Sequence, residues 1–78
     1  MPRAEREWQD RAKALLRAEL ARRQMTARDL AERLQEMGAQ ENVRSVENKI
    51  ARGAFSAGFF IQCLSAIGCR TIRLEPDD

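Results

Sequence analysis

Apolar residues recur at intervals of three and four along the first half of the chain, which is the spacing of a helix that buries one face. The first run predicts an amphipathic helix over residues 7–23. The second run predicts a helix over residues 27–37. Thr26 and Asp29 form the capping-box pattern that begins such a helix, and Gly38 is a natural residue to end it.

Two more helices are predicted in the second half of the chain. Asn42 is a suitable N-cap for a helix over residues 43–52, and Gly53 follows that helix as a C-terminal stop. Ser56 is a suitable N-cap for a fourth helix over residues 57–67. The chain is therefore expected to contain four short helices.

The fourth helix lacks charge. The sequence AFSAGFFIQCLSAIGC, between Gly53 and Arg70, has no charged residue, although 33% of the chain is charged. A helix that is apolar nearly all round is buried nearly all round. Four short helices cannot enclose one of their own members, so we expect one face to pack on the core and the other on a second copy of the chain. The alternative is a helix enclosed in one chain, with Phe59 covered by the first helix. The residues expected in the homodimer interface are Phe59, Gln62, Ala66, Ile72 and Leu74.

The fold class follows from these elements. We expect one all-α domain over residues 1–78, with a short strand or an extended tail over residues 70–74, where apolar residues alternate before Pro76. Two interpretations of this segment remain open: it pairs with its copy in a dimer, or it packs as a tail against the helices. The residues expected to share the core are Leu30, Leu34, Val46, Ile50, Phe55, Phe60 and Leu64.

Composition argues against several classes of function. The 78 residues suffice for one small core, and the net charge of +2 is only a mild basic excess. There is no His, and no carboxylate pair, phosphate-binding loop or activated nucleophile can be assembled, so we expect neither an enzyme nor a cofactor. Cys63 and Cys69 are too few for a zinc site without His, so no metal is expected. We interpret them as small apolar residues of a cytoplasmic protein. The uncharged run is too short to cross a bilayer, so no membrane partner is expected.

One carboxylate lies in an apolar position. Glu19 falls within the apolar arc of the first helix, where a charge needs a cation or a backbone donor. Arg23, one turn further along, is the simplest partner. A basic residue from another helix is the alternative.

The outward face of the third helix carries the residue types that read DNA. Arg pairs with guanine edges and Asn with adenine edges in bidentate geometry. Arg44, Asn48 and Arg52 stand about one turn apart along one side, as a helix in a major groove requires. The alternative is a solvated polar face with ion pairs such as Glu41–Arg44. The residues expected to contact DNA are Arg44, Ser45, Asn48 and Arg52, with Lys49 and Arg22 holding phosphates.

Two stretches resemble the phage-repressor type of helix-turn-helix domain. The string ARRQMTARDLAERL resembles its opening, where a Thr or Ser cap leads into a helix containing Leu-Ala; here these are Thr26, Leu30 and Ala31. KIARG followed by LSAIG resembles the end of its recognition helix and the helix after it. From Ala31 to Gly53 the chain is several residues longer than that pattern, so the turn or the third helix is expected to be extended.

A second resemblance covers residues 8–74. The strings DLAERL, GAQENV, NKIARGAFSAGFF and QCLSAIG resemble, in this order, a group of small bacterial proteins classed as a domain of unknown function. This resemblance implies a repressor-like all-helical fold and leaves the activity open.

The sequence thus predicts a small dimeric helix-turn-helix-like DNA-binding protein that regulates transcription. The alternative is a dimeric protein–protein interaction module, of the adaptor or antitoxin kind, that does not bind DNA. Salt dependence separates the two, because DNA binding weakens steeply as salt rises while an apolar protein interface does not.

Overall fold

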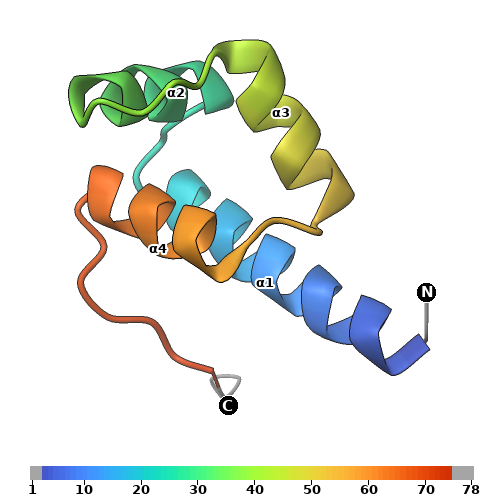
Figure 1. The fold of residues 1–78 in the computed structure, drawn as a ribbon. Coiled ribbons are helices and arrows are strands. Elements are labelled where there is room, and N and C mark those ends of the chain that lie inside the picture. The colour runs from blue at the N-terminus through green and yellow to red at the C-terminus, as the bar shows by residue number, and fades with distance from the viewer. Residues whose placement is uncertain (1–2, 75–78) are drawn as a thin grey trace.

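The computed structural model describes residues 3–74 of the chain, which form four helices joined by short connections (Figure 1). The prediction of an all-α fold with four helices is confirmed, and there is no β-strand in the described range. The helices are α1 (Arg3–Arg22), α2 (Ala27–Glu36), α3 (Val43–Arg52) and α4 (Ala57–Ala66).

Helix α4 lies between α1 and α2. It packs against α1 on one side and against α2 on the other, and α3 packs on α2. In Figure 1, α1 and α4 lie side by side in the lower part of the molecule, with α2 and α3 above them. The outer side of α3 is therefore left open to solvent.

All four helices contribute side chains to one core. Its largest fully enclosed side chains are Leu16, Leu30, Leu34, Val46 and Cys63. Of the residues predicted for the core, all are buried except Phe55 and Phe60. Those two are partly buried, and their rings stack on each other with centroids 5.8 Å apart.

Phe59 occupies the core position that was predicted for Phe60. It is only 7% exposed. Because a helix turns about 100° per residue, Phe59, Cys63 and Ala66 share the stripe of α4 that faces the core. The assignment of Phe59 and Ala66 to a dimer interface is therefore corrected, since both are buried within their own chain. Gln62, also assigned to that interface, is half-buried.

The C-terminal segment runs as an extended tail over the described residues up to Leu74. Ile72 packs against the core and is partly buried, while Leu74 is 67% exposed. The guanidinium of Arg11 donates a hydrogen bond to the Leu74 carbonyl oxygen. This arrangement corresponds to the tail interpretation of residues 70–74, and no strand forms there in the single chain.

The helix boundaries follow the capping residues read from the sequence. The amide of Asp29 donates to the Thr26 hydroxyl at 3.2 Å, and the Thr26 amide donates to the Asp29 carboxylate at 2.9 Å. The amide of Phe59 donates to the Ser56 hydroxyl at 3.0 Å. These contacts supply partners for amides that have none in the first turn of a helix. Both predicted helix starts are confirmed.

Helix α1 begins earlier than predicted, and its first turns extend beyond the other helices (Figure 1). Trp8, the first apolar residue of its stripe, is 66% exposed for this reason. The guanidinium of Arg11 lies 5.3 Å from the centre of the Trp8 ring. The stripe of α1 becomes buried only further along, at Leu16 and Leu20.

Glu19 is buried in the α1 stripe, as expected, and Arg23 is its partner. Nη1 of Arg23 lies 2.6 Å from the Glu19 carboxylate and 3.0 Å from the Glu19 carbonyl oxygen. The hydrogen bond from Arg23 lowers the pKa of Glu19 more than burial raises it. The ionised carboxylate is thus the form that the fold stabilises.

Candidate functional site

Helix α3 is fixed at both ends and along its inner face. The amide of Ser45 donates to Oδ1 of Asn42 at 2.8 Å, and the Asn42 amide donates to the Ser45 hydroxyl at 3.0 Å. Val46 and Ile50 face the core and are buried. Gly53 ends the helix with φ of 69°, a left-handed conformation that glycine adopts without steric cost. The position of the outer face is therefore set by the fold itself.

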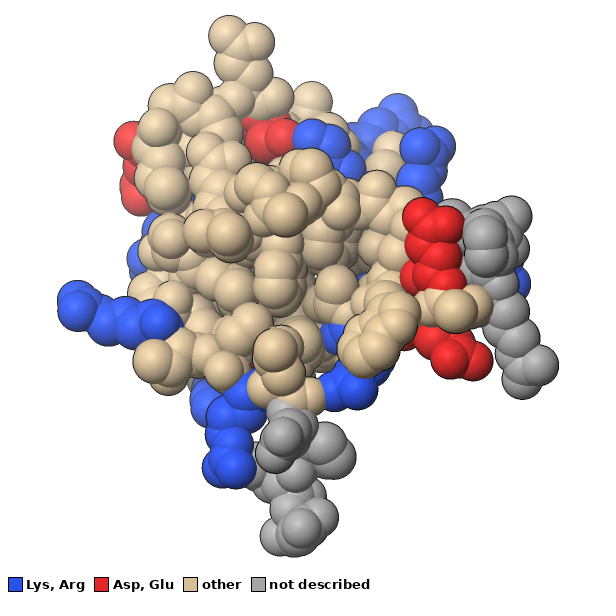
Figure 2. All heavy atoms as spheres, turned by 60° about the horizontal axis from the view of Figure 1, so that its bottom comes forward, with Lys and Arg blue, Asp and Glu red and all other residues tan. Residues whose placement is uncertain are grey.

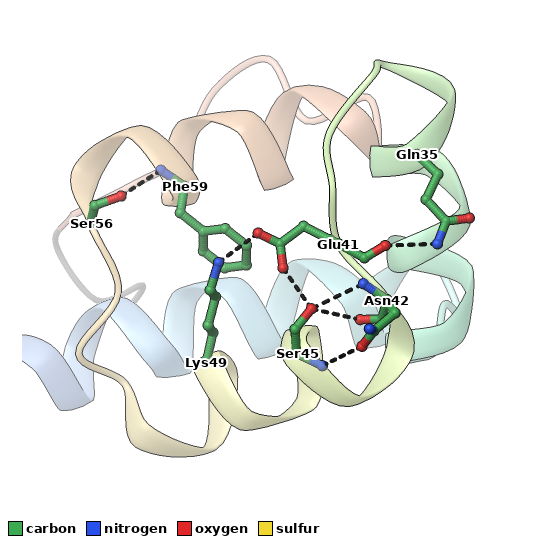
Figure 3. Close-up of polar contacts among 7 residues, drawn as sticks. All are labelled: Gln35, Glu41, Asn42, Ser45, Lys49, Ser56 and Phe59. Carbon is green, nitrogen blue, oxygen red and sulfur yellow. Dashed lines mark hydrogen bonds and ion pairs between the residues drawn. The ribbon is translucent and has the colours of Figure 1, made fainter.

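A network centred on Glu41 joins α2, α3 and α4 (Figure 3). The Lys49 ammonium lies 2.5 Å from one carboxylate oxygen of Glu41, and the Ser45 hydroxyl donates to the other at 2.7 Å. The side-chain amide of Gln35 donates to the Glu41 carbonyl oxygen at 2.7 Å. The Lys49 ammonium also lies over the Phe59 ring, 4.8 Å from its centre. We call Glu41, Ser45 and Lys49 the Glu41 brace.

The brace contains two residues that were predicted to contact DNA. Ser45 and Lys49 both contact Glu41 within the chain, and their contact with DNA stays a prediction. Burial alone would raise the pKa of Glu41, yet the hydrogen bonds from Lys49 and Ser45 outweigh that effect and lower it. The ion pair that the sequence suggested between Glu41 and Arg44 is replaced by Glu41–Lys49. Lys49 thus helps to hold α3 to the preceding connection, through Glu41, and to α4, through Phe59.

Removing the lysine charge from the brace is expected to destabilise the fold. The Glu41 side chain is 12% exposed, so without Lys49 it would keep a largely buried negative charge with one fewer partner. Since the Lys49 side chain is 45% exposed, water screens part of the attraction, and we expect Lys49→Met to cost about 1–2 kcal/mol. Thermal unfolding measures this cost. Arg44→Met is the matched control, because Arg44 is exposed on the same helix, and an equal loss in both variants would contradict a bracing role.

Three exposed side chains form a row along the outer side of α3. Arg44, Asn48 and Arg52 lie four residues apart and are all exposed. None of them makes a hydrogen bond or ion pair with another residue between positions 3 and 74. We call these three residues the α3 ridge. Their donors are therefore available to a ligand without breaking a contact in the described part of the fold.

The basic residues of α1 divide between two sides of that helix. The Lys13 ammonium donates to the carbonyl oxygen of Ala51 in the last turn of α3, at 2.7 Å. Arg17 lies on the same side, next to α3. Arg22 comes five positions after Arg17, about 140° further round the helix, and it borders the groove between α1 and the tail. Arg22, which was predicted to hold a phosphate, thus lies on a different side of α1 from Arg17.

Lys13 and Arg17 are the α1 cations that tertiary structure brings to α3. The sequence showed them only as members of a basic helix, because their distance from α3 depends on the packing of two helices far apart in the chain. The carbonyl groups at the C-terminus of a helix attract a cation, which gives Lys13 a structural role. Arg17 is exposed and is the better placed of the two to meet an anion.

An open hollow of about 460 Å³ lies beside the ridge, where α1, the start of α2 and α3 meet. Its lining is mostly apolar and includes Leu20, Met25 and Ile50. Arg17 and Glu47 stand on opposite helices at its border. The negative charge of Glu47 would repel a phosphate at that position. The hollow is therefore better suited to an apolar side chain than to a nucleic-acid backbone.

Three carboxylates with lowered pKa make stability depend on pH. The pKa of Asp29 is lowered by the backbone and hydroxyl of Thr26, and those of Glu19 and Glu41 by the contacts described above. An unperturbed glutamate titrates near 4.5. Because the folded pKa values lie below the unfolded ones, their contribution is complete above about pH 4.5 and is lost as the pH falls through the folded values.

We therefore expect the melting temperature to fall on acidification below pH 4.5 more steeply in the wild type than in Glu41→Gln. The glutamine keeps the size of the side chain but cannot ionise. At neutral pH the variant should melt at a lower temperature than the wild type. Melting curves at several pH values test both statements. The same acid dependence in the two proteins would mean that Glu41 titrates as it does in the unfolded chain.

The family model described as a domain of unknown function, DUF6471, matches residues 8–72 of the chain. No curated protein and no solved structure shows significant similarity to it. None of the helices in the described residues has the length and apolar character needed to cross a membrane.

Proposed function

We propose that this chain, which belongs to the DUF6471 family, binds double-stranded DNA through the α3 ridge and thereby regulates transcription. The observation that carries the proposal is the ridge itself. Arg44, Asn48 and Arg52 are exposed in a row, and no contact in the described residues occupies their polar groups. The remainder of α3 is held by its caps, its buried face and the Glu41 brace, so binding would not require the helix to move.

The chemistry of the ridge suits the edges of base pairs. An arginine fork donates two hydrogen bonds to guanine, and an asparagine amide both donates to and accepts from adenine. The ten residues of α3 span about 15 Å, and a major groove about 12 Å wide admits a helix. Arg17, on the neighbouring helix, supplies a cation for the phosphate backbone. Glu47, beside the hollow, would repel phosphates and limits how the duplex can approach there.

The connection between α2 and α3 bears on this proposal. It spans residues 37–42, between the end of α2 and the start of α3. This connection carries Glu41 and therefore the brace. We infer the DNA contacts from the ridge residues of this chain, and a helix-turn-helix frame is part of the proposal.

The direct test is fluorescence anisotropy of a labelled random-sequence DNA duplex titrated with the wild-type protein at increasing salt. We expect binding at low salt that weakens steeply as salt rises, because contacts to phosphates release counterions. Absence of binding at low salt would overturn the proposal.

A protein–protein interaction module is the second candidate function. The apolar hollow bordered by Leu20, Met25 and Ile50 favours it, because it could accept an apolar side chain of another protein. The mild net charge of +2 is compatible with such a partner. This function predicts that the protein does not bind DNA at low salt, so the anisotropy experiment separates the two candidates.

A further inference from the structure

The outer side of α4 is exposed and uncharged. With Phe59, Cys63 and Ala66 turned inward, the residues turned to solvent are Ala57, Gly58, Ile61 and Ser65. Ile61 is 62% exposed. We call these four residues the α4 face. The side of a surface helix that faces solvent ordinarily carries charged or polar residues. The α4 face carries no charged residue.

The lack of charge extends over a wide area of the surface. Figure 2 shows the molecule with the lower side of Figure 1, where α1, α4 and the tail lie, turned forward. The centre of this view contains almost no charged side chain, and the lysines, arginines and carboxylates stand mainly around its edge. An uncharged centre with a charged rim is the distribution found in many protein interfaces.

We propose that the α4 face packs against the same face of a second copy of this chain, related by a two-fold axis. In such an arrangement each surface meets an identical surface, and an uncharged one is complementary to itself. A partner with a charged surface would have to bury its charges against the α4 face without receiving a counter-charge. Ala57 and Gly58 have little or no side chain, so they leave space beside Ile61 for a closely approaching helix.

This inference does not depend on DNA binding. It replaces the interface residues expected from the sequence, because Phe59 and Ala66 are buried within the chain and Ile61 is exposed. If the dimer also binds DNA, it would present two α3 ridges related by the same two-fold axis, and the preferred DNA site would then be palindromic.

Sedimentation equilibrium over a range of concentrations tests the proposed dimer, with two variants of the α4 face. Ile61→Lys places a charge at the centre of the face, where the side chain is exposed in the monomer. Gly58→Glu is the second variant: a Cβ at Gly58 would meet only the Ser56 hydroxyl, at 3.9 Å. A carboxylate in the first turn of a helix is also favourable, so the monomer should keep its fold.

Met37→Lys is the matched control. Met37 is an apolar residue, 50% exposed, that follows α2 and does not belong to the α4 face. Its replacement by lysine adds the same charge as Ile61→Lys. We expect the wild type and this control to sediment at twice the mass of the chain. In both α4-face variants the dissociation constant should rise by at least about tenfold.

Two results would overturn the proposal. One is a wild-type protein that remains monomeric at high concentration, which would mean that the α4 face is left bare or is covered by a different protein. The other is a dimer that persists unchanged in Ile61→Lys and Gly58→Glu, which would place the contact on another surface. Circular dichroism of each variant confirms that the comparison is made between folded proteins.

Discussion

Phe59→Ala is expected to destabilise the fold by about 3–5 kcal/mol, a large share of the stability of so small a domain. Phe59 is buried at the point where α4 meets the Glu41 brace, and its ring lies 5.6 Å from that of Phe55 and under the Lys49 ammonium. Removing this ring leaves a cavity and also removes the aromatic face that the Lys49 ammonium contacts. Because a domain of this size loses several degrees for each kcal/mol, the melting temperature should fall by more than about 12 °C.

Phe60→Ala is the matched control for this experiment. Phe60 is the same residue type, one position further along α4, but it is only partly buried, and its ring stacks on that of Phe55. The lost transfer energy and the cavity should both be smaller. If Phe60→Ala lowers the melting temperature as much as Phe59→Ala does, the orientation of α4 described above is wrong.

Asn48→Ala is expected to lower specific DNA affinity by about 1–3 kcal/mol without changing the melting temperature. The loss arises because an adenine edge would no longer be paired, and the stability is unaffected because Asn48 makes no hydrogen bond in the described residues. Anisotropy with a duplex selected from a random pool measures the affinity, and selection with the variant should show relaxed preference at one position. Arg52→Ala should lose a similar amount of specific affinity.

Asn48→Ala is informative because it leaves the net charge unchanged. A general weakening of electrostatic attraction therefore cannot explain its effect. If the variant melts at a lower temperature but binds DNA normally when folded, Asn48 is a structural residue and its assignment to base contacts fails. Lys49→Ala would report mainly on the stability of the Glu41 brace.

Local sequence signals were sufficient to predict most of the fold. The capping residues Thr26, Asn42 and Ser56 mark three helix starts, because each satisfies amides of its own first turn and needs no distant partner. The pairing of Glu19 with Arg23 was predictable for the same reason, since residues four apart meet on one helix face.

The errors concern features that depend on how helices pack. Neighbouring phenylalanines differ by only about 100° around α4, so the sequence could not tell whether Phe59 or Phe60 faces the core. The partner of Lys49 is Glu41, eight residues away in the preceding connection, and only the path of that connection brings the two together. The surroundings of Arg22 also depend on packing, because the packing of α1 turns it toward the tail.

The candidate site was predictable in part. The spacing of Arg44, Asn48 and Arg52 follows from helical geometry alone, and the structure places all three on the exposed side of α3. Whether a polar residue is free or engaged depends on tertiary contacts, which is why Ser45 and Lys49 were included with them. The same limit applies to the dimer surface, where the absence of charge was visible in the sequence but the exposed residues were not.

The most direct test of DNA binding through the α3 ridge compares two double variants of equal charge. Arg44→Gln with Arg52→Gln removes both cations of the ridge, and Arg22→Gln with Arg70→Gln removes two exposed cations elsewhere. Anisotropy titrations with the same duplex across a salt series should show a large loss of affinity for the ridge variant only, because its two arginines are the ones assigned to base edges. Equal losses in the two variants, or a wild-type protein that does not bind DNA at low salt, would contradict the proposed site.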